Sequence, residues 1–352
     1  MNRDAALFVA GERGLVGSGI VRALRRRGFS KVISAPRAAL DLRDQPAVER
    51  FFAERQPEYV FIAAAKVGGI LANDTYPADF IRDNLLIQNN VIDASYRHGV
   101  RKLCFLGSSC VYPRLAPQPL HEDSLLSGPL EPTNQWYAVA KIAGLKMCEA
   151  YSRQYGFNAI SVMPTNLYGP GDNFDLKTSH VLPALIRKFH EAKQARSGAV
   201  TIWGSGTPRR EFLHVDDLAD ALLFLMERYD SPDLINVGWG EDITIAELAA
   251  LVRGVVGFEG GIEHDRSKLH QQPEPLRPLY RLRAVAHSQL AVHGAGVLLD
   301  RVLRQMQRFG DLGIRRSRRH QLEHRALPFR EPERTGVVAV ALAREHALAE
   351  TH

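Results

Sequence analysis

Four side chains with complementary proton chemistry lie in two short segments of the chain. Ser108 and Cys110 belong to residues 107–113, and Tyr137 and Lys141 follow further on. Residues four apart share one face of a helix, so the phenol and the ammonium can point into the same cleft. Lowering a phenol pKa from about 10 by about three units takes about 4 kcal/mol. A cation about 4 Å away supplies that energy at an effective dielectric of about 20, so we expect Lys141 to make Tyr137 a proton donor.

A glycine-rich turn upstream has the pattern of a dinucleotide site. The apolar run at residues 7–10 ends at a glycine, and a helical pattern then extends to about Arg27. The first glycine permits the turn, the second lets the backbone approach a pyrophosphate, and the third lets helix and strand pack closely. The free N–H groups at the start of the helix would bind the phosphates. The residues expected to contact the cofactor here are Gly11, Arg13, Gly14, Leu15, Val16 and Gly17.

The segment after the second predicted strand, residues 31–34, favours NADP over NAD. An NAD site usually has an acidic residue here for the ribose 2′-hydroxyl, whereas this chain has Arg37. Arg37 and Arg13 suit a 2′-phosphate, although both could instead be solvated surface side chains. We also expect Asp41 on the adenine side of the cofactor.

Two further apolar runs, residues 59–64 and 102–107, are typical of strands buried on both faces of a parallel sheet. A helical pattern at residues 77–98 separates them. Since the carboxyl ends of parallel strands meet at one edge, Ser108 and Cys110 are expected at the cofactor edge. The sequence therefore predicts an α/β fold: a Rossmann-type doubly wound parallel sheet with a smaller C-terminal α/β substrate lobe.

Four longer motifs carry a resemblance to a particular family with this fold. They are residues 105–113 (FLGSSCVYP), 166–170 (NLYGP), 179–190 (SHVLPALIRKFH) and 203–217 (WGSGTPRREFLHVDD). Over about residues 5–268 the chain resembles the GDP-L-fucose synthase family of extended short-chain dehydrogenases/reductases. The resemblance implies a two-part reaction on GDP-4-keto-6-deoxy-D-mannose, namely epimerisation at C3 and C5 and then NADPH reduction of the 4-ketone.

The resemblance also implies a role for each chemical side chain. Tyr137, assisted by Lys141, would protonate the C4 oxygen as hydride arrives, and Ser108 would orient that oxygen. Epimerisation needs a base on one face of the sugar and an acid on the other. Cys110 matches the family's base and His180 its acid, and no metal is required. Two plainer readings stay open: Cys110 as a small buried apolar residue, and His180 as a structural histidine.

Contacts to the two ligands follow from the same resemblance. Besides the glycine turn, the residues implied to contact the cofactor are Leu106, Gly107, Lys141, Pro164, Asn166, Leu167 and His180. Those implied to hold the nucleotide diphosphate are Lys188, Trp203 and Arg210. A cation suits phosphate, and an arginine can bind it through two parallel hydrogen bonds. Lys188 alone could equally be a solvated surface charge.

Composition favours a soluble, cytoplasmic enzyme. The chain has 352 residues, 45% of them hydrophobic. No apolar run approaches the roughly 18 residues that a membrane helix needs, so we expect no membrane partner. Three cysteines without metal-ligand spacing favour a reducing compartment over a disulfide framework. The superfamily commonly pairs helices across a two-fold axis, which implies a homodimer.

The pattern changes abruptly after Lys268. The remaining residues contain 14 arginines, no lysine and 8 acidic residues, which accounts for the whole formal charge of +6. We interpret this segment as a divergent Arg/His-rich tail translated in a shifted reading frame of a GC-rich gene, with a locally helical pattern at 297–309. A nucleic-acid-binding appendage is the other interpretation, but the tail lacks interleaved aromatic residues and we expect no nucleic-acid partner.

The expected organisation is an NADP-binding domain at 1–165 with returning segments from 212–240, a substrate lobe at 166–268, and a tail at 269–352.

Two other activities are weighed against the epimerase-reductase. A 4,6-dehydratase would carry an Asp-Glu pair where this chain has Ser109-Cys110, and a C4-epimerase would not need Cys110 and His180. The altered C-terminus leaves a non-catalytic NADP-binding remnant as the remaining alternative.

Overall fold

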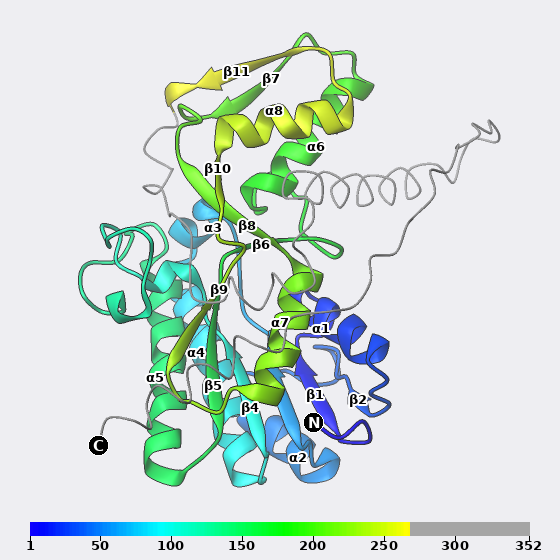
Figure 1. The fold of residues 1–352 in the computed structure, drawn as a ribbon, viewed down its shortest axis with the longest axis vertical. Coiled ribbons are helices and arrows are strands. Elements are labelled where there is room, and N and C mark those ends of the chain that lie inside the picture. The colour runs from blue at the N-terminus through cyan, green and yellow to red at the C-terminus, as the bar shows by residue number, and fades with distance from the viewer. Residues whose placement is uncertain (268–352) are drawn as a thin grey trace, which may run out of the picture.

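Six parallel strands form the central sheet of the computed structural model, which describes residues 1–267 (Figure 1). In spatial order they are β2 (Val32–Ile33), β1 (Leu7–Ala10), β3 (Tyr59–Ile62), β4 (Lys102–Leu106), β5 (Ala159–Pro164) and β9 (Leu234–Val237). The chain runs outward from β1 to β2 and returns to β3 on the other side of β1. Ligands bind at such a reversal, outside the carboxyl ends of the strands. The predicted doubly wound sheet is confirmed.

Helices cover both faces of the sheet. One face is covered by α1 (Leu15–Arg26) and α7 (Val215–Arg228), and the other by α2 (Gln45–Arg55), α4 (Pro77–Arg97) and α5 (Gln135–Tyr155) (Figure 1). Successive strand residues point to opposite faces. Leu7 and Val9 accordingly join the core under α1 and α7, whereas Phe8 and Ala10 join the core under α2, α4 and α5. Burial on both faces explains why the strands are continuous apolar runs.

A smaller lobe follows the carboxyl end of β5 (Figure 1). Its elements are β6 (Asn166–Tyr168), α6 (Val181–Gln194), β7 (Ala199–Trp203), β8 (Arg209–His214), β10 (Asp242–Thr244), α8 (Ile245–Val256) and β11 (Gly261–Asp265). The strands pair as β10-β8-β6 and as β11-β7. The lobe has its own core, in which α6 packs against α8.

Three short elements complete the described chain: α3 (Ile70–Thr75), η1 (Ser109–Val111) and η2 (Glu122–Ser124). None of the helices within residues 1–267 is both long enough and apolar enough to cross a membrane. The predicted Arg/His-rich tail, including the helical pattern at 297–309, lies outside the described residues.

Candidate active site

The turn between β1 and α1 forms a backbone cradle that requires glycine. Gly11 has a φ of +88°, and a Cβ atom there would lie 2.8 Å from Ala64 Cα. A Cβ on Gly17 would overlap the Gly11 carbonyl oxygen, which already accepts a 3.0 Å hydrogen bond from Gly14 N–H. Gly14 caps α1 without a side-chain hydrogen bond, so the cradle fits a pyrophosphate on the helix terminus. The predicted contacts gathered at this turn are Gly11, Arg13, Gly14, Leu15, Val16 and Gly17.

The charged residues near the turn differ in their exposure and in whether they already form an ion pair. The Arg13 side chain is 78% exposed, with only a 3.8 Å contact to Glu12, and Arg37 is also exposed. Asp41 instead accepts hydrogen bonds from Arg43 Nε at 3.0 Å and Nη2 at 2.7 Å, which lower the pKa of Asp41 to about 2. Arg13 and Arg37 are therefore accessible to a 2′-phosphate. Asp41, by contrast, already forms an ion pair with Arg43.

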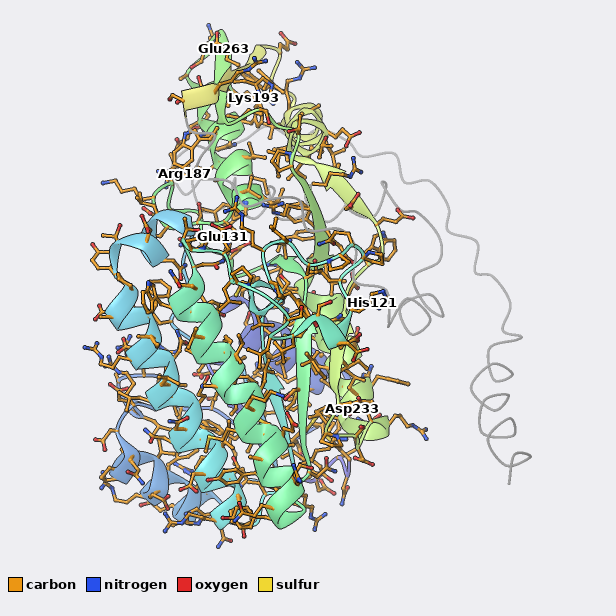
Figure 2. The ribbon with its side chains drawn as sticks, turned by 90° about the vertical axis from the view of Figure 1, so that its left-hand side faces the viewer. His121, Glu131, Arg187, Lys193, Asp233 and Glu263 are labelled. Carbon is orange, nitrogen blue, oxygen red and sulfur yellow. The ribbon has the colours of Figure 1, made fainter. Side chains whose placement is uncertain are left out.

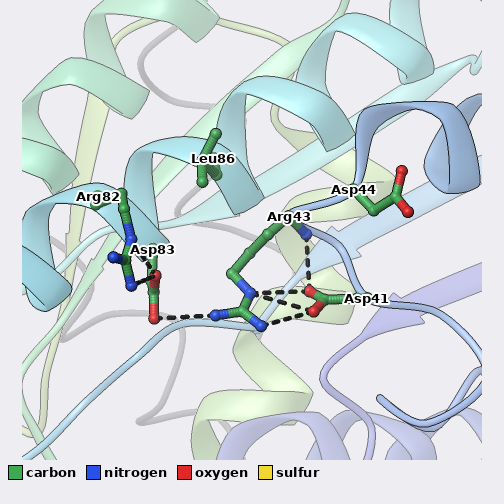
Figure 3. Close-up of a pocket in the computed structure, with 6 residues that line it drawn as sticks. All are labelled: Asp41, Arg43, Asp44, Arg82, Asp83 and Leu86. Atoms are coloured by element: carbon green, nitrogen blue, oxygen red, sulfur yellow. Dashed lines mark hydrogen bonds and ion pairs between the residues drawn. The ribbon is translucent and has the colours of Figure 1, made fainter.

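A pocket of about 270 Å³ adjoins this ion pair, between the segment before α2 and the start of α4 (Figure 3). It is lined by Asp41, Arg43, Asp44, Arg82, Asp83 and Leu86. Figure 3 shows Arg43 between Asp41 and Asp83, with Asp44 pointing away: Arg43 Nη1 donates to Asp83 at 3.4 Å, and Arg82 Nη2 donates to it at 2.8 Å. The pocket is thus largely self-neutralised and separate from the Ser108–Tyr137 chemistry.

The proton-transfer residues converge at the carboxyl end of β4. Lys141 is 4% exposed and its Nζ donates a 2.8 Å hydrogen bond to the Leu106 carbonyl. The Ser108 hydroxyl lies within hydrogen-bonding reach of both the Cys110 thiol and the Tyr137 phenol, and it lowers the pKa of each. Gly107, just before Ser108, leaves room for the Met163 side chain of β5, which a Cβ there would overlap. The structure therefore brings Ser108, Cys110, Tyr137 and Lys141 into one cluster.

Burial dominates the electrostatics of this cluster. It raises the pKa of Cys110 to about 11, and the hydrogen bond from Ser108 and the charge of Lys141 act in the opposite direction. Burial lowers the pKa of Lys141 to about 8, which the charges of Cys110 and Cys148 counteract. The lysine can therefore exchange its proton near neutral pH.

The pKa of Tyr137 moves in the direction opposite to the one expected from the sequence. Burial raises it, the nearby Cys110 raises it further, and the Ser108 hydrogen bond lowers it only in part. Lys141 Nζ lies 5.8 Å from the Tyr137 ring centroid and bonds to the Leu106 carbonyl. Because the ammonium is directed at that carbonyl, burial decides the sign. Tyr137 is thus held as a neutral phenol, the form that can give a proton.

His180 enters from the smaller lobe. It is the N-cap residue of α6, and its side chain makes no capping hydrogen bond. The residue is exposed, yet the protein around its ring disfavours the imidazolium and lowers the His180 pKa. The adjacent backbone contacts the loop after β3, where Gly69 N–H donates to the Thr178 carbonyl at 2.9 Å.

The predicted nicotinamide contacts lie at the same sheet edge as Ser108. Leu106 pairs in register with Val162 of β5, and Pro164 ends that strand. Asn166 Nδ2 then donates to the Glu211 carbonyl at 2.9 Å, which fixes the start of β6 against β8. Leu167 follows within β6.

The predicted diphosphate contacts come from three elements of the smaller lobe. Lys188 of α6 lies over the Trp203 ring of β7, with Nζ 5.3 Å from its centroid, and donates to the Thr201 carbonyl at 3.1 Å. Burial lowers the pKa of Lys188, which argues against a fully solvated surface charge. Arg210 of β8 is 9% exposed and burial lowers its pKa to about 10. Lys188 and Arg210 are therefore held partly out of water, and both are donors that can form charge-assisted hydrogen bonds to phosphate.

Sequence reasoning assigned no role to two buried residues that stabilise the site. Glu211 is 2% exposed and accepts from Gly240 N–H at 2.7 Å. The Tyr112 hydroxyl donates to Asn236 Oδ1 at 2.5 Å, which ties the segment after Cys110 to β9. Both residues lie inside the quoted motifs, but their partners are distant in sequence, and a single sequence gives no signal for such pairs.

Comparison with known proteins identifies the family. The model of the family described as NAD dependent epimerase/dehydratase family matches residues 7–238. A probable GDP-L-fucose synthase 1 of Oryza sativa subsp. japonica is 61% identical over 276 residues, 78% of this chain and 84% of that protein. The GDP-L-fucose synthase of Escherichia coli (strain K12) is 53% identical, over 78% of this chain and 89% of that protein. A solved GDP-L-fucose synthetase of Naegleria fowleri bound to NADP is 28% identical with a TM-score of 0.78, covering 88% of this chain and 95% of that one. The chain belongs to the NAD dependent epimerase/dehydratase family, within its GDP-L-fucose synthase group.

Proposed function

We propose that the protein converts GDP-4-keto-6-deoxy-D-mannose to GDP-L-fucose by 3,5-epimerisation and NADPH-dependent reduction of the 4-ketone. The observation that carries the proposal is the cluster at the carboxyl end of β4, where the Ser108 hydroxyl lies within reach of both the proton donor Tyr137 and the thiol of Cys110. One site thereby contains the reducing groups together with the proposed base of the epimerisation. The protein is an NADP-dependent oxidoreductase with epimerase activity.

The cofactor is NADP(H), and when bound it supplies the hydride for C4. The glycine cradle would hold its pyrophosphate, Arg13 and Arg37 its 2′-phosphate, and Asp41 would lie on the adenine side. The residues that would contact its nicotinamide end are Leu106, Gly107, Lys141, Pro164, Asn166, Leu167 and His180. These assignments rest on the backbone that only glycine permits and on the exposure of the two arginines.

For the reduction, Tyr137 donates its phenolic proton to the C4 oxygen, and Ser108 orients that oxygen by a hydrogen bond. The raised pKa of Tyr137 keeps the proton on the phenol until charge develops on the substrate oxygen. Lys141, with a pKa lowered to about 8, can then replace that proton. The three groups lie on β4's loop and α5, so their relation is set within one lobe.

For the epimerisation, Cys110 removes the proton from C3 and C5, which the neighbouring ketone acidifies, and His180 returns a proton on the opposite face. The thiol must first lose its own proton, which burial opposes by raising the pKa of Cys110 to about 11. The Ser108 hydroxyl and the charge of Lys141 favour the thiolate, the form that acts as the base. A lowered pKa makes the His180 imidazolium a stronger acid.

Lys188, Trp203 and Arg210 hold the nucleotide diphosphate in the smaller lobe. The NADP-binding domain then comprises residues 1–165 with returning segments from 212–240, and the substrate lobe comprises 166–268. We also propose a cytoplasmic homodimer with neither nucleic acid nor membrane as partner. Leu86 of α4 and Val139 of α5, 39% and 41% exposed, provide apolar surface on adjacent helices for such pairing.

The test is an assay of the full chain with GDP-4-keto-6-deoxymannose and NADPH. We expect stoichiometric NADPH oxidation and a chromatographic product identical to GDP-L-fucose. Tight NADPH binding without turnover would instead identify a non-catalytic NADP-binding remnant. Conversion of GDP-mannose itself would point to a 4,6-dehydratase.

A further inference from the structure

We propose that residues 172–179 form a clasp, closed by Asp175 and docked on Gly69, that positions His180 for the epimerisation without contributing to the reduction. Asp175 and Gly69 are thus positioning residues, which act through His180. The inference deepens the proposed function and rests on the acid role given there to His180. It concerns how the two lobes are held in register at the site.

The clasp is closed by a single carboxylate oxygen. Asp175 Oδ1 accepts hydrogen bonds from Lys177 N–H, Thr178 N–H and Thr178 Oγ1, each at 3.0 Å. The backbone carbonyl of Asp175 also accepts from Ser179 N–H at 2.8 Å. Asn173 Nδ2 reaches across the loop to Thr178 Oγ1 at 2.8 Å. The residues immediately before His180 are therefore fixed by Asp175.

The closed clasp docks on the loop after β3. Gly69 N–H donates to the Thr178 carbonyl at 2.9 Å. A Cβ at position 69 would lie only 2.9 Å from the Ser179 carbonyl oxygen, so glycine is required for this approach. The loop itself is held by Asn73, whose Nδ2 donates to the Gly68 carbonyl at 2.7 Å and to the Gly69 carbonyl at 3.1 Å. Since β3 belongs to the central sheet, the contact joins the clasp to the lobe that carries Cys110.

The other end of the clasp is tied to α6. Arg187 Nη1 donates to the Phe174 carbonyl at 3.1 Å, and its Nε donates to Glu191 at 2.7 Å. Figure 2 shows Arg187 at the end of the smaller lobe that faces the central sheet. His180 lies between these two anchors and spends no ring atom on capping α6. The backbone that carries His180 is consequently held on both sides, and its ring makes no capping bond to α6.

The groups that reduce the ketone are held outside the clasp, so at saturating NADPH the proposed contact of His180 with the cofactor should not limit the reduction. Ser108, Tyr137 and Lys141 are held by β4, α5 and the Leu106 carbonyl. Loosening the clasp should therefore move His180 relative to Cys110 and leave the reducing groups in place. Misplacing a reacting group by about 1 Å can lower a rate by on the order of 10².

The experiment separates the two half-reactions in the full-length protein. Exchange of deuterium from solvent into C3 and C5 reports epimerisation, and NADPH oxidation with a pre-epimerised 4-ketone reports reduction. Asp175→Ala removes the acceptor, whereas Asp175→Asn keeps an Oδ1 acceptor. Gly69→Ala introduces the Cβ that meets Ser179. Matched controls are Asp74→Ala, which removes an exposed carboxylate from α3, and Gly198→Ala, where a Cβ meets nothing within 4 Å.

We expect Asp175→Ala and Gly69→Ala to slow deuterium exchange about 10- to 100-fold, with reduction of the pre-epimerised ketone within about twofold of wild type. Asp175→Asn should restore exchange, and both controls should match wild type. Equal loss of exchange and reduction, or no loss of either, would overturn the positioning role. Thermal unfolding of each variant shows whether it is folded. If Asp175→Ala is unfolded, the exchange and reduction rates of Gly69→Ala and Asp175→Asn test the positioning role in its place.

A readout independent of activity distinguishes this inference from the proposed function. The rate at which diethyl pyrocarbonate modifies His180, measured by peptide mass spectrometry, should rise in Asp175→Ala and Gly69→Ala and stay at the wild-type rate in Asp175→Asn. If wild type exchanges no deuterium but these labelling rates change as expected, the proposed function fails and the positioning stands. Unchanged labelling in all variants would refute the positioning even where wild type is active.

Discussion

Replacing Lys141 with methionine should abolish reduction without destabilising the protein at neutral pH. The pKa of Lys141 is lowered to about 8, from an ordinary value of 10.5. At about 1.4 kcal/mol per pKa unit, the buried ammonium is disfavoured by about 3 kcal/mol. Its hydrogen bond to the Leu106 carbonyl returns about 1.5–3 kcal/mol. These two effects nearly cancel, and methionine fills a similar volume with little strain.

The pH dependence of stability tests the lowered pKa of Lys141 directly. Lys141 holds its proton less tightly in the folded protein than in the unfolded chain. Between about pH 8 and about pH 10.5 the unfolded chain therefore binds more protons, and the free energy of unfolding rises with pH. Wild type should gain up to about 3 kcal/mol relative to Lys141→Met across this range.

The assay is urea unfolding of both proteins at several pH values, followed by tryptophan fluorescence, with the difference between the two free energies plotted against pH. Taking the difference removes the contributions of titrating groups that do not interact with Lys141; those that do, Cys110 and Cys148, have pKa values raised to about 11 and about 12. NADPH oxidation should fall on the order of 10²-fold or more in the variant. A flat difference curve would refute the lowered pKa, and a variant that retains wild-type turnover would refute the catalytic role.

Three further changes test other parts of the site. Cys110→Ser should impair deuterium exchange at C3 and C5 more than reduction of a pre-epimerised ketone, and equal loss of both would count against the base role. Tyr112→Phe leaves the Asn236 oxygen buried without its 2.5 Å donor, so urea unfolding should show a loss of about 1–3 kcal/mol; a change below about 0.5 kcal/mol would show that this bond is not stabilising. Arg37→Ala should weaken NADPH binding about 10- to 100-fold, the equivalent of about 1.5–3 kcal/mol. Calorimetry should show an unchanged affinity for NADH. An equal loss of affinity for both cofactors would contradict contact of Arg37 with the 2′-phosphate.

Much of the fold could be predicted because burial leaves a strong mark on the sequence. The runs that became β1 and β3 are continuous and apolar because helices cover both faces of the sheet. The glycine turn was recognisable for a related reason, since Gly11 and Gly17 occupy positions where a Cβ would collide with backbone. Such local requirements can be read from one chain.

The sequence did not predict the direction of the Tyr137 pKa shift or which residues distant in sequence would contact each other. The spacing of Tyr137 and Lys141 gives a shared helix face, but it does not show that Lys141 Nζ bonds to the Leu106 carbonyl. The sign of the Tyr137 pKa shift was therefore missed, because burial decides it. The contact of Gly69 with Thr178 joins segments far apart in the chain, and no periodicity indicates which loops will meet.

The Ser108 hydroxyl has one hydrogen to give and two lone pairs with which to accept. It lies within hydrogen-bonding reach of both Cys110 and Tyr137, and at any moment it can donate to only one of them. When Cys110 loses its proton the hydroxyl turns toward the thiolate, and its lone pairs are then open to the hydrogen of Tyr137. The protonation states of the two residues are thereby correlated through the rotation of a single O–H bond.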